Sequence, residues 1–263
     1  MSSFMGALAK NGRSLSRNMT SSVLRGNSKA KSGDIHVQQV PESRYRDVLD
    51  HITPIFLQDE PLSQCFPHCT TGQRERDFHE YAETQLRSGL CVMALDGSTV
   101  VGACLSRPLK RDQVIGCSIP PSDDPAEDPL IANVARMLIT VHQQLNLFET
   151  LGVDTFFEVG LLSVEPSHTG RGLALKMARA SLELGASQGF RAAKADCTSA
   201  ASASIMGRTG MMPVHRLLYD EYKIDNRVVF KKTPIRGPAL TVMAARLQDI
   251  QPHVLPVEIK SKI

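Results

Sequence analysis

The alternation of hydrophobic and polar positions predicts a chain of short strands and amphipathic helices. Apolar residues that alternate or form short runs favour strands, and apolar residues spaced three to four positions apart favour helices. We predict strands over 34–40, 91–109 (a hairpin turning at Asp96-Gly97), 155–164, 191–197, 212–222 and 226–232. Helices are predicted over 41–57, 73–89, 129–152, 172–187 and 199–210. The segment 239–247 fits either a final edge strand or a helix.

This mixture of strands and helices predicts an α/β protein with a mixed sheet. A chain of 263 residues buries enough apolar surface to fold without disulfides or a structural metal. The predicted elements delimit one domain over 34–247, between an N-terminal tail over 1–33 and a C-terminal tail over 248–263.

Charge is unevenly distributed along the chain. Residues 1–33 carry six basic residues and no acidic one, which leaves 24 basic against 27 acidic residues and a net charge of −3 for the rest. The predicted domain therefore lacks the basic excess of a general nucleic-acid binder, and we expect no nucleic-acid partner. The tail is rich in Ser, Asn and Gly. It fits either the disordered end of a cytoplasmic protein or a mitochondrial transit peptide.

Hydropathy indicates no membrane segment. No stretch reaches the roughly 18 consecutive apolar residues of a membrane span, and no secretory apolar region stands near the N-terminus. We therefore expect no membrane association. The six cysteines are expected to be reduced thiols.

The segment "LLSVEPSHTGRGLALKMARASLEL", 161–184, places two glycines between a strand and a helix. The first amides of a helix lack intrahelical partners, and the helix dipole favours an anion there. Gly170 and Gly172 would let a bulky diphosphate approach the backbone. A P-loop is excluded because no Ser or Thr follows Lys176, and a dinucleotide-binding turn fits poorly because residue 175 is leucine. Small residues that only ease packing at a helix start are the remaining alternative.

This strand, loop and helix together resemble motif A of the GCN5-related N-acetyltransferase superfamily, whose loop reads Arg/Gln-x-x-Gly-x-Gly/Ala. The resemblance implies that superfamily's fold, a mixed and mostly antiparallel sheet of about seven strands flanked by helices. A splayed strand pair in that sheet binds acetyl-CoA, through backbone pairing with the pantetheine arm and loop amides on the diphosphate. Thr169 replaces the usual Arg or Gln here. The implied cofactor-binding residues are Leu162, Ser163, Val164, Thr169, Gly170, Arg171, Gly172, Leu173 and Ala174.

Further motifs narrow the resemblance. The stretch "FLQDEPLSQ", 56–64, is similar to the Asp-Glu-Pro-Leu motif of arthropod arylalkylamine N-acetyltransferases, and "ADCTSAASASIMGRTGM", "LLYDEYKID" and "TVMAARL" also fit that family. The resemblance covers about residues 34–247 and implies that Glu60 is a general base. An arylalkylamine, like lysine, has a pKa near ~10, and only its neutral form attacks a thioester. The alternative for Glu60 is an exposed acid in a turn.

The same resemblance assigns catalytic roles to three further side chains. Thr198 and Ser202 would aid proton transfer or bind the cofactor, although both also suit an ordinary helix start. A tyrosine after that helix would protonate the departing thiolate. Tyr222 and Tyr219 are the candidates, and either also suits a packed core position.

The sequence thus predicts a monomeric enzyme that transfers acetyl directly to a small arylalkylamine of the dopamine, serotonin, tyramine, octopamine or tryptamine type. The alternatives are an N-acetyltransferase for a protein amino group or a polyamine, and a CoA-binding regulatory module without catalysis. No metal is expected, because the spacing of the residues that could suggest zinc matches no strong ligand pattern. Those residues are Cys65, His68, Cys69 and His79.

Overall fold

The computed structural model describes residues 35–59, 62, 71–114, 130–230 and 239–250, which belong to one compact unit, Ser32–Ile263. Its helices are α1 (Tyr45–Asp59), α2 (Thr71–Leu86), α3 (Leu130–Leu145), α4 (Leu147–Leu151), α5 (Leu173–Ser187) and α6 (Ala200–Arg208). Its strands are β1 (His36–Gln39), β2 (Val92–Asp96), β3 (Thr99–Lys110), β4 (Thr155–Val164), β5 (Ala192–Cys197), β6 (Met212–Leu218), β7 (Lys223–Ile224), β8 (Arg227–Val228) and β9 (Ala239–Arg246). The predicted N-terminal tail, Glu60, Cys65, His68 and Cys69 lie outside the described residues.

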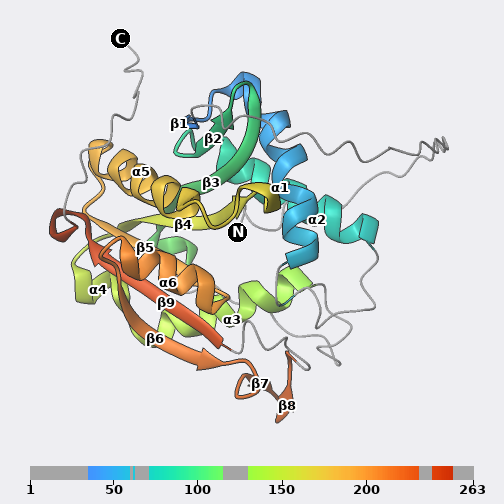
Figure 1. The fold of residues 1–263 in the computed structure, drawn as a ribbon. Helices are drawn as coiled ribbons and strands as arrows, with labels where there is room; N and C mark the ends of the chain where they lie inside the picture. Colours follow the sequence, from blue (N-terminus) through green and yellow to red (C-terminus); the bar gives the residue numbers. More distant parts are fainter. Residues whose placement is uncertain (1–34, 60–61, 63–70, 115–129, 231–238, 251–263) are drawn as a thin grey trace. The chain divides into compact units, whose positions relative to one another are not determined.

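Seven strands form one sheet in the order β1-β2-β3-β4-β5-β9-β6 (Figure 1). Within this described sheet, β4 and β5 are the parallel pair, and the other neighbours are antiparallel. The predicted mixed, mostly antiparallel sheet of about seven strands is therefore confirmed. β2 and β3 form the predicted hairpin, and Gly97 takes a φ of 62° in its turn.

Helices cover both faces of the sheet (Figure 1). On one face, α5 and α6 share a hydrophobic core with the strands, to which Met177, Met206 and Phe157 belong. On the other face, α1 and α2 pack over β2 and β3 in a second core, and α3 and α4 contribute to a third core with β4, β5 and β9. The second face therefore has two apolar regions. Charged side chains, described below, lie between them.

Two glycines allow α5 to approach the sheet closely. A Cβ atom on Gly102 of β3 would lie 2.7 Å from Cε of Met177, and one on Gly185 of α5 would lie 2.7 Å from the ring of Phe157. Any larger residue would displace these side chains. An apolar stripe of α5 is buried against the sheet: Leu173, Met177, Ala180 and Leu184. This packing sets the start of α5 close to the end of β4.

The prediction of one helix over 129–152 is wrong in one respect, because the segment forms two helices. α3 ends at Leu145, and Asn146 adopts a left-handed conformation with φ 47° before α4 begins. Asparagine is among the few non-glycine residues that tolerate this conformation. One side of α3 nevertheless packs into the core, since Met137 and Val141 are buried.

The predictions for the last strands need correction. The strand predicted over 212–222 ends at Leu218, where Glu221 donates its N–H to the Leu218 carbonyl and turns the chain. Instead of a strand over 226–232, the two-residue strands β7 and β8 form a separate hairpin around Asp225 and Asn226. Both of these turn residues have positive φ, as a type I′ turn requires.

The segment 239–247 is a strand, but it is not an edge strand. β9 lies between β5 and β6 and pairs with both in antiparallel register. Its residues Leu240, Val242 and Met243 are consequently buried. The apolar composition of this segment therefore reflects an interior position in the sheet.

Candidate acyl-CoA site

β4 and β5 separate partway along their length. Residues Phe157–Val159 pair with Ala193–Ala195, and no further pair follows between these described strands. β4 continues to Val164 beside β3, and β5 continues to Cys197 beside β9. On β3, Ser106 pairs with Val159 and the neighbouring Leu105 pairs with Leu161. Gly160 is therefore an extra residue in β4. Such a bulge bends a strand, and it stands where the fork between β4 and β5 opens.

The fork exposes an unpaired backbone edge of β4. Glu165 donates its N–H to the carbonyl of Val101 on β3 at 2.9 Å. Because backbone groups alternate in direction along an antiparallel ladder, those of Leu162 and Val164 are turned towards the fork. An extended ligand can pair with such an edge as an added strand. These two predicted cofactor residues therefore offer an edge with which an extended ligand could pair.

The third residue of this segment, Ser163, is held by α1. Its hydroxyl lies 3.1 Å from Nε2 of His51, and Nδ1 of His51 lies 3.9 Å from the carboxylate of Glu165. Burial lowers the pKa of His51 to about 4, so the imidazole is neutral near pH 7. The contact fixes α1 against the forked strand. Sequence reasoning missed it because the two residues are 112 positions apart and neither stands in a recognisable motif.

The loop after β4 is anchored to the neighbouring hairpin. Nε2 of His168 lies 3.2 Å from the carboxylate of Asp96 in the β2–β3 turn. The hydroxyl of Thr169 donates to the carbonyl of Pro166 at 2.9 Å. The Thr169 side chain thus stabilises the turn itself. The loop is therefore held in place before any ligand binds.

The two loop glycines leave room for a large anion. Gly170 and Gly172 have φ values of 75° and 74°, and a Cβ on either would meet no atom within 4 Å. The first backbone bond of α5 runs from the Lys176 N–H to the Gly172 carbonyl. No described residue accepts a hydrogen bond from the amides of 170–174. Open space beside free amides at a helix start fits a diphosphate group.

Three other predicted residues meet at the end of β5. The hydroxyl of Tyr219 donates to the carbonyl of Thr198 at 3.0 Å. The hydroxyl of Ser199 accepts from the N–H of Ser202, and the hydroxyl of Ser202 accepts from the N–H of Ser199, which together cap α6. The Ser202 hydroxyl therefore has the helix-start role expected of it on structural grounds.

Tyr222 has different surroundings. It packs against Phe230, with ring centroids 5.8 Å apart. Burial raises the pKa of Tyr222, and a hydrogen bond with Thr140 on α3 opposes that shift. Leu62, two residues after Glu60, is buried in the same core as Tyr219 and Tyr222. The last residue of the Asp-Glu-Pro-Leu motif therefore lies in the core that contains both tyrosines.

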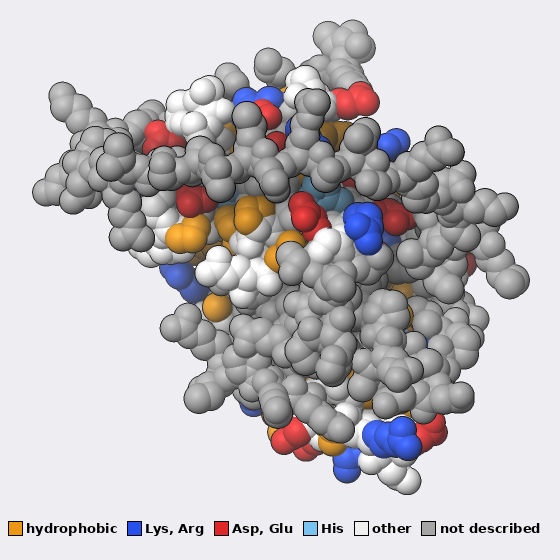
Figure 2. All heavy atoms as spheres, turned by 90° about the vertical axis from the view of Figure 1, so that its right-hand side faces the viewer, with side chains coloured by type: hydrophobic (Ala, Val, Ile, Leu, Met, Phe, Trp, Pro, Cys, Tyr) orange, Lys and Arg blue, Asp and Glu red, His pale blue; other side chains and the backbone are white. Residues whose placement is uncertain are grey.

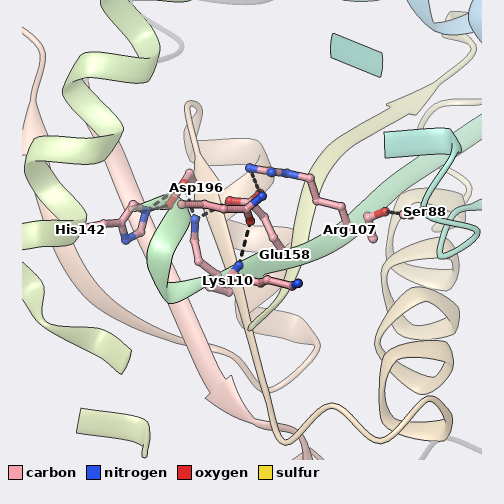
Figure 3. Close-up of polar contacts among 9 residues, drawn as sticks. Ser88, Arg107, Lys110, His142, Glu158 and Asp196 are labelled. Carbon is pink, nitrogen blue, oxygen red and sulfur yellow. Dashed lines mark hydrogen bonds and ion pairs between the residues drawn. The ribbon is translucent and has the colours of Figure 1, made fainter. Parts of the chain in front are cut away.

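A row of buried charged side chains crosses the sheet beside the fork (Figure 3). Arg107 of β3 lies 2.7 Å from Glu158 of β4. Lys194 of β5 lies 2.6 Å from both Glu158 and Asp196, and Nε2 of His142 on α3 lies 2.9 Å from Asp196. Asp196 is the first residue of β5 beyond its last pair with β4. We call these five residues the charged row, and its Asp196 end stands at the fork.

Mutual pairing keeps Glu158, Lys194 and Asp196 ionised. Burial alone would raise the pKa of Asp196, but the charges of His142 and Lys194 outweigh it and lower that pKa. For Glu158 the raising effect of burial is likewise outweighed, by Lys194 and then Arg107. The two carboxylates in turn raise the pKa of Lys194 against the effect of its burial. A buried group left without its partner would instead favour its neutral form.

Sequence analysis did not find the charged row, although a signal was present. Glu158 interrupts the apolar strand "TFFEVG", and Lys194 and Asp196 interrupt "AAKADC". A charge within an otherwise buried strand needs a partner nearby. The strand register then identifies the partners, because Glu158 stands opposite both Arg107 and Lys194.

Figure 2 shows the face at the right of Figure 1, where described acidic, basic and hydrophobic side chains are interspersed. Among the described residues, no group of three or more His, Cys, Asp or Glu side chains is placed to hold a metal ion. None of the helices that the structure describes is long and apolar enough to cross a membrane.

Solved structures with a similar fold include insect N-acetyltransferases. Arylalkylamine N-acetyltransferase 2 from Aedes aegypti matches with a TM-score of 0.70 and 24% identity, over 82% of this chain and 100% of that chain. Mosquito arylalkylamine N-acetyltransferase like 5b matches with a TM-score of 0.68 and 16% identity, over 81% and 100%. The fold is that of these arylalkylamine N-acetyltransferases. This confirms the fold implied by the sequence motifs.

A third N-acetyltransferase of this fold has another kind of acceptor. The polyamine N-acetyltransferase of Drosophila melanogaster, described as forming N-acetylagmatine, matches with a TM-score of 0.67 and 18% identity, over 81% of this chain and 100% of that chain. No protein-family model matches the chain. The shared fold therefore accommodates both arylalkylamine and polyamine acceptors in other proteins.

The open glycine loop leads to a first prediction, for Gly172→Val. A valine side chain would occupy the space beside the free amides, so calorimetry should show CoA binding weakened by about 10- to 100-fold. That range corresponds to one charge-assisted hydrogen bond of about 1.5–3 kcal/mol. The apparent constant for the amine should change much less.

Gly189→Val is the matched control for this prediction. Gly189, beyond the other end of α5, also has a positive φ of 84° and open space around an added Cβ. Both variants should lose comparable stability from backbone strain, but Gly189→Val should bind CoA normally. Equal CoA affinity in the two folded variants would remove the loop from the cofactor site.

Proposed function

We propose that this protein transfers the acetyl group of acetyl-CoA to the primary amine of a small arylalkylamine. The observation that carries the proposal is the fork between β4 and β5, whose unpaired edge leads to the open amides at the start of α5. In an N-acetyltransferase fold, this arrangement suits a pantetheine arm and a diphosphate together. The same geometry also suits a CoA-binding module, so turnover must be measured directly.

The reaction proposed is direct attack in a ternary complex. The amine nitrogen bonds to the thioester carbon, a tetrahedral intermediate forms, and the carbon–sulfur bond then breaks. Glu60 is the proposed base that removes the ammonium proton, directly or through water. The thiolate of CoA takes a proton from a tyrosine, for which Tyr222 and Tyr219 are the candidates, and the proton that the nitrogen loses as the amide forms restores the tyrosine. Thr198 and Ser202 are proposed to assist at the end of β5.

The described interior supports an aromatic acceptor over a polycation. A polyamine carries a second positive charge that needs a carboxylate. Both buried carboxylates of the charged row already have partners, Glu158 with Arg107 and Lys194, and Asp196 with Lys194 and the imidazole of His142. Apolar aromatic surface is present instead. Phe56, in the last part of α1, is partly exposed and stacks on Phe78 with centroids 4.1 Å apart.

A panel of amines with the purified protein and acetyl-CoA, followed by thiol release, tests this function. We expect kcat/KM to be highest for tyramine, dopamine, octopamine, serotonin or tryptamine, and at least about tenfold lower for agmatine, spermidine and a short peptide. Among the aromatic amines a smaller spread is expected, since pockets separate single-group changes by about 10–200-fold at most without a buried polar partner. Preference for agmatine or spermidine would establish the polyamine alternative, and CoA binding without turnover would establish the regulatory module.

A further inference from the structure

Gln85, near the end of α2, carries a buried amide without a partner. The residue is fully buried, and neither Oε1 nor Nε2 has a hydrogen-bond partner in the described structure. Buried side-chain amides are almost always paired, because burial without a hydrogen bond is unfavourable. The backbone of the same residue is tied down, since its carbonyl accepts from the thiol of Cys91. The backbone of Gln85 is therefore held in place, and its unpaired side-chain amide needs an explanation.

The amide lies directly against the bulge of β4. A Cβ atom on Gly160 would be 2.9 Å from Nε2 and 3.0 Å from Cδ of Gln85. Gly160 has no positive φ, so its backbone conformation does not require glycine. The close approach of Gln85 requires it. Gly160 is only half-buried, because β5 no longer covers its edge at this point.

Gly160 also marks the closed end of the fork. A ligand that starts at the loop amides of 170–174 and follows the edge of β4 passes Val164 and Leu162 before it reaches Gly160. If that ligand is acetyl-CoA, its diphosphate is at the loop and its acyl end is at the bulge. The unpaired amide of Gln85 and the reacting carbonyl are then neighbours. This step rests on the function proposed above.

We propose that Gln85 binds the acyl group, with its amide N–H donating to the thioester oxygen. When the amine nitrogen bonds to the carbonyl carbon, negative charge develops on that oxygen, and the donor then stabilises it. The charge returns as the carbon–sulfur bond breaks and the electron pair leaves on sulfur. The terminal side-chain torsion of Gln85 is soft, so the amide can turn its N–H towards a group bound at the bulge. A donor aimed at developing charge raises kcat more than it tightens binding.

Gln85→Met tests the proposal, because it keeps side-chain length and removes the amide. The melting temperature should stay the same or rise, since an unpaired buried amide is lost. The turnover number should fall by about 10²-fold, with the KM for the amine little changed. Gln85→Leu is a second variant in case the longer methionine side chain packs poorly. It should show the same loss of turnover. If Gln85 only packed in the core, its replacement would lower activity through a loss of stability. Lower activity at unchanged or higher stability would therefore indicate a role in the reaction.

Thr209→Val is the matched control. The Thr209 hydroxyl is also buried, but it donates to the carbonyl of Met206 at 2.7 Å, on α6 and away from the bulge. This variant should lose stability and keep its turnover number. The proposal is overturned if Gln85→Met and Gln85→Leu keep the wild-type kcat, or if their activity falls only as far as their folded fraction. Failure of the proposed function is distinct from either result, because the wild-type protein itself would then show no turnover.

Discussion

Glu60→Gln is expected to lower turnover by about 10²–10⁴-fold, the usual contribution of general base catalysis. Glutamine keeps the size of the side chain and removes its basicity, so an ammonium acceptor would no longer lose its proton within the site. Acetyl-CoA affinity should change little, because the base acts on the amine. The acidic limb of the pH–rate profile should flatten or move. Steady-state kinetics across pH, with calorimetry for acetyl-CoA, provide both measurements.

Two comparisons make the Glu60 experiment decisive. Raising the pH should partly rescue Glu60→Gln, because more of the amine is then already neutral. Asp59→Asn, at the last residue of α1, should be much milder if Glu60 is the base. Near-normal turnover of Glu60→Gln with an unchanged pH profile would show that the proton leaves by another route. A water chain, Tyr219 or Tyr222 would then be the next candidates.

The elements with strong local signals were predictable from the sequence. The strand 155–164 coincides with β4, and the predicted helix 172–187 differs from α5 by one residue at its start. Both contain long apolar patterns bounded by turn residues, and local pattern is what sequence reasoning can use. The glycine loop was found for the same reason, since its chemistry lies in a few consecutive residues.

What depends on distant contacts was not predictable in this way. The apolar pattern of 239–247 fits a helix, an edge strand and an interior strand equally well. Its pairing with both β5 and β6 makes it an interior strand. The break at Asn146 was not predictable because the helical spacing of apolar residues continues on both sides of it. Gln85 gives no signal in the sequence, because its significance comes from meeting Gly160, 75 positions away, at the bulge. Tertiary contacts decide all three cases.

The charged row leads to the second large expected effect, a loss of stability in Lys194→Met. Lys194 is 1% exposed and bridges Glu158 and Asp196, each at 2.6 Å. Without it, the two buried carboxylates keep just Arg107 and His142 as partners among the residues that the structure describes. Breaking a buried ion pair in this way typically costs about 3–5 kcal/mol of unfolding free energy. Urea unfolding near neutral pH should show a loss of that size.

The sign of the pH dependence follows from the carboxylates. The pKa values of Glu158 and Asp196 are lowered in the folded protein, so their stabilisation is present above the unfolded values of about 4 and is lost as pH falls. In Lys194→Met the folded pKa values should rise, because a cation has been removed. The difference in stability between wild type and variant should therefore be largest near about pH 8 and should narrow towards about pH 5.

A double variant and an exposed control separate this account from a simple packing defect. Lys194→Met with Asp196→Asn removes one charge of each sign and keeps the Glu158–Arg107 pair, so it should be more stable than the sum of the two single changes predicts. Arg87→Met removes the exposed pair with Glu83 and should leave stability nearly unchanged at either pH. Strictly additive losses that do not vary with pH would show that Lys194 contributes through its packed methylenes alone. Coupling that weakens with acid would show that paired buried charges hold β4 and β5 together up to the point where they separate.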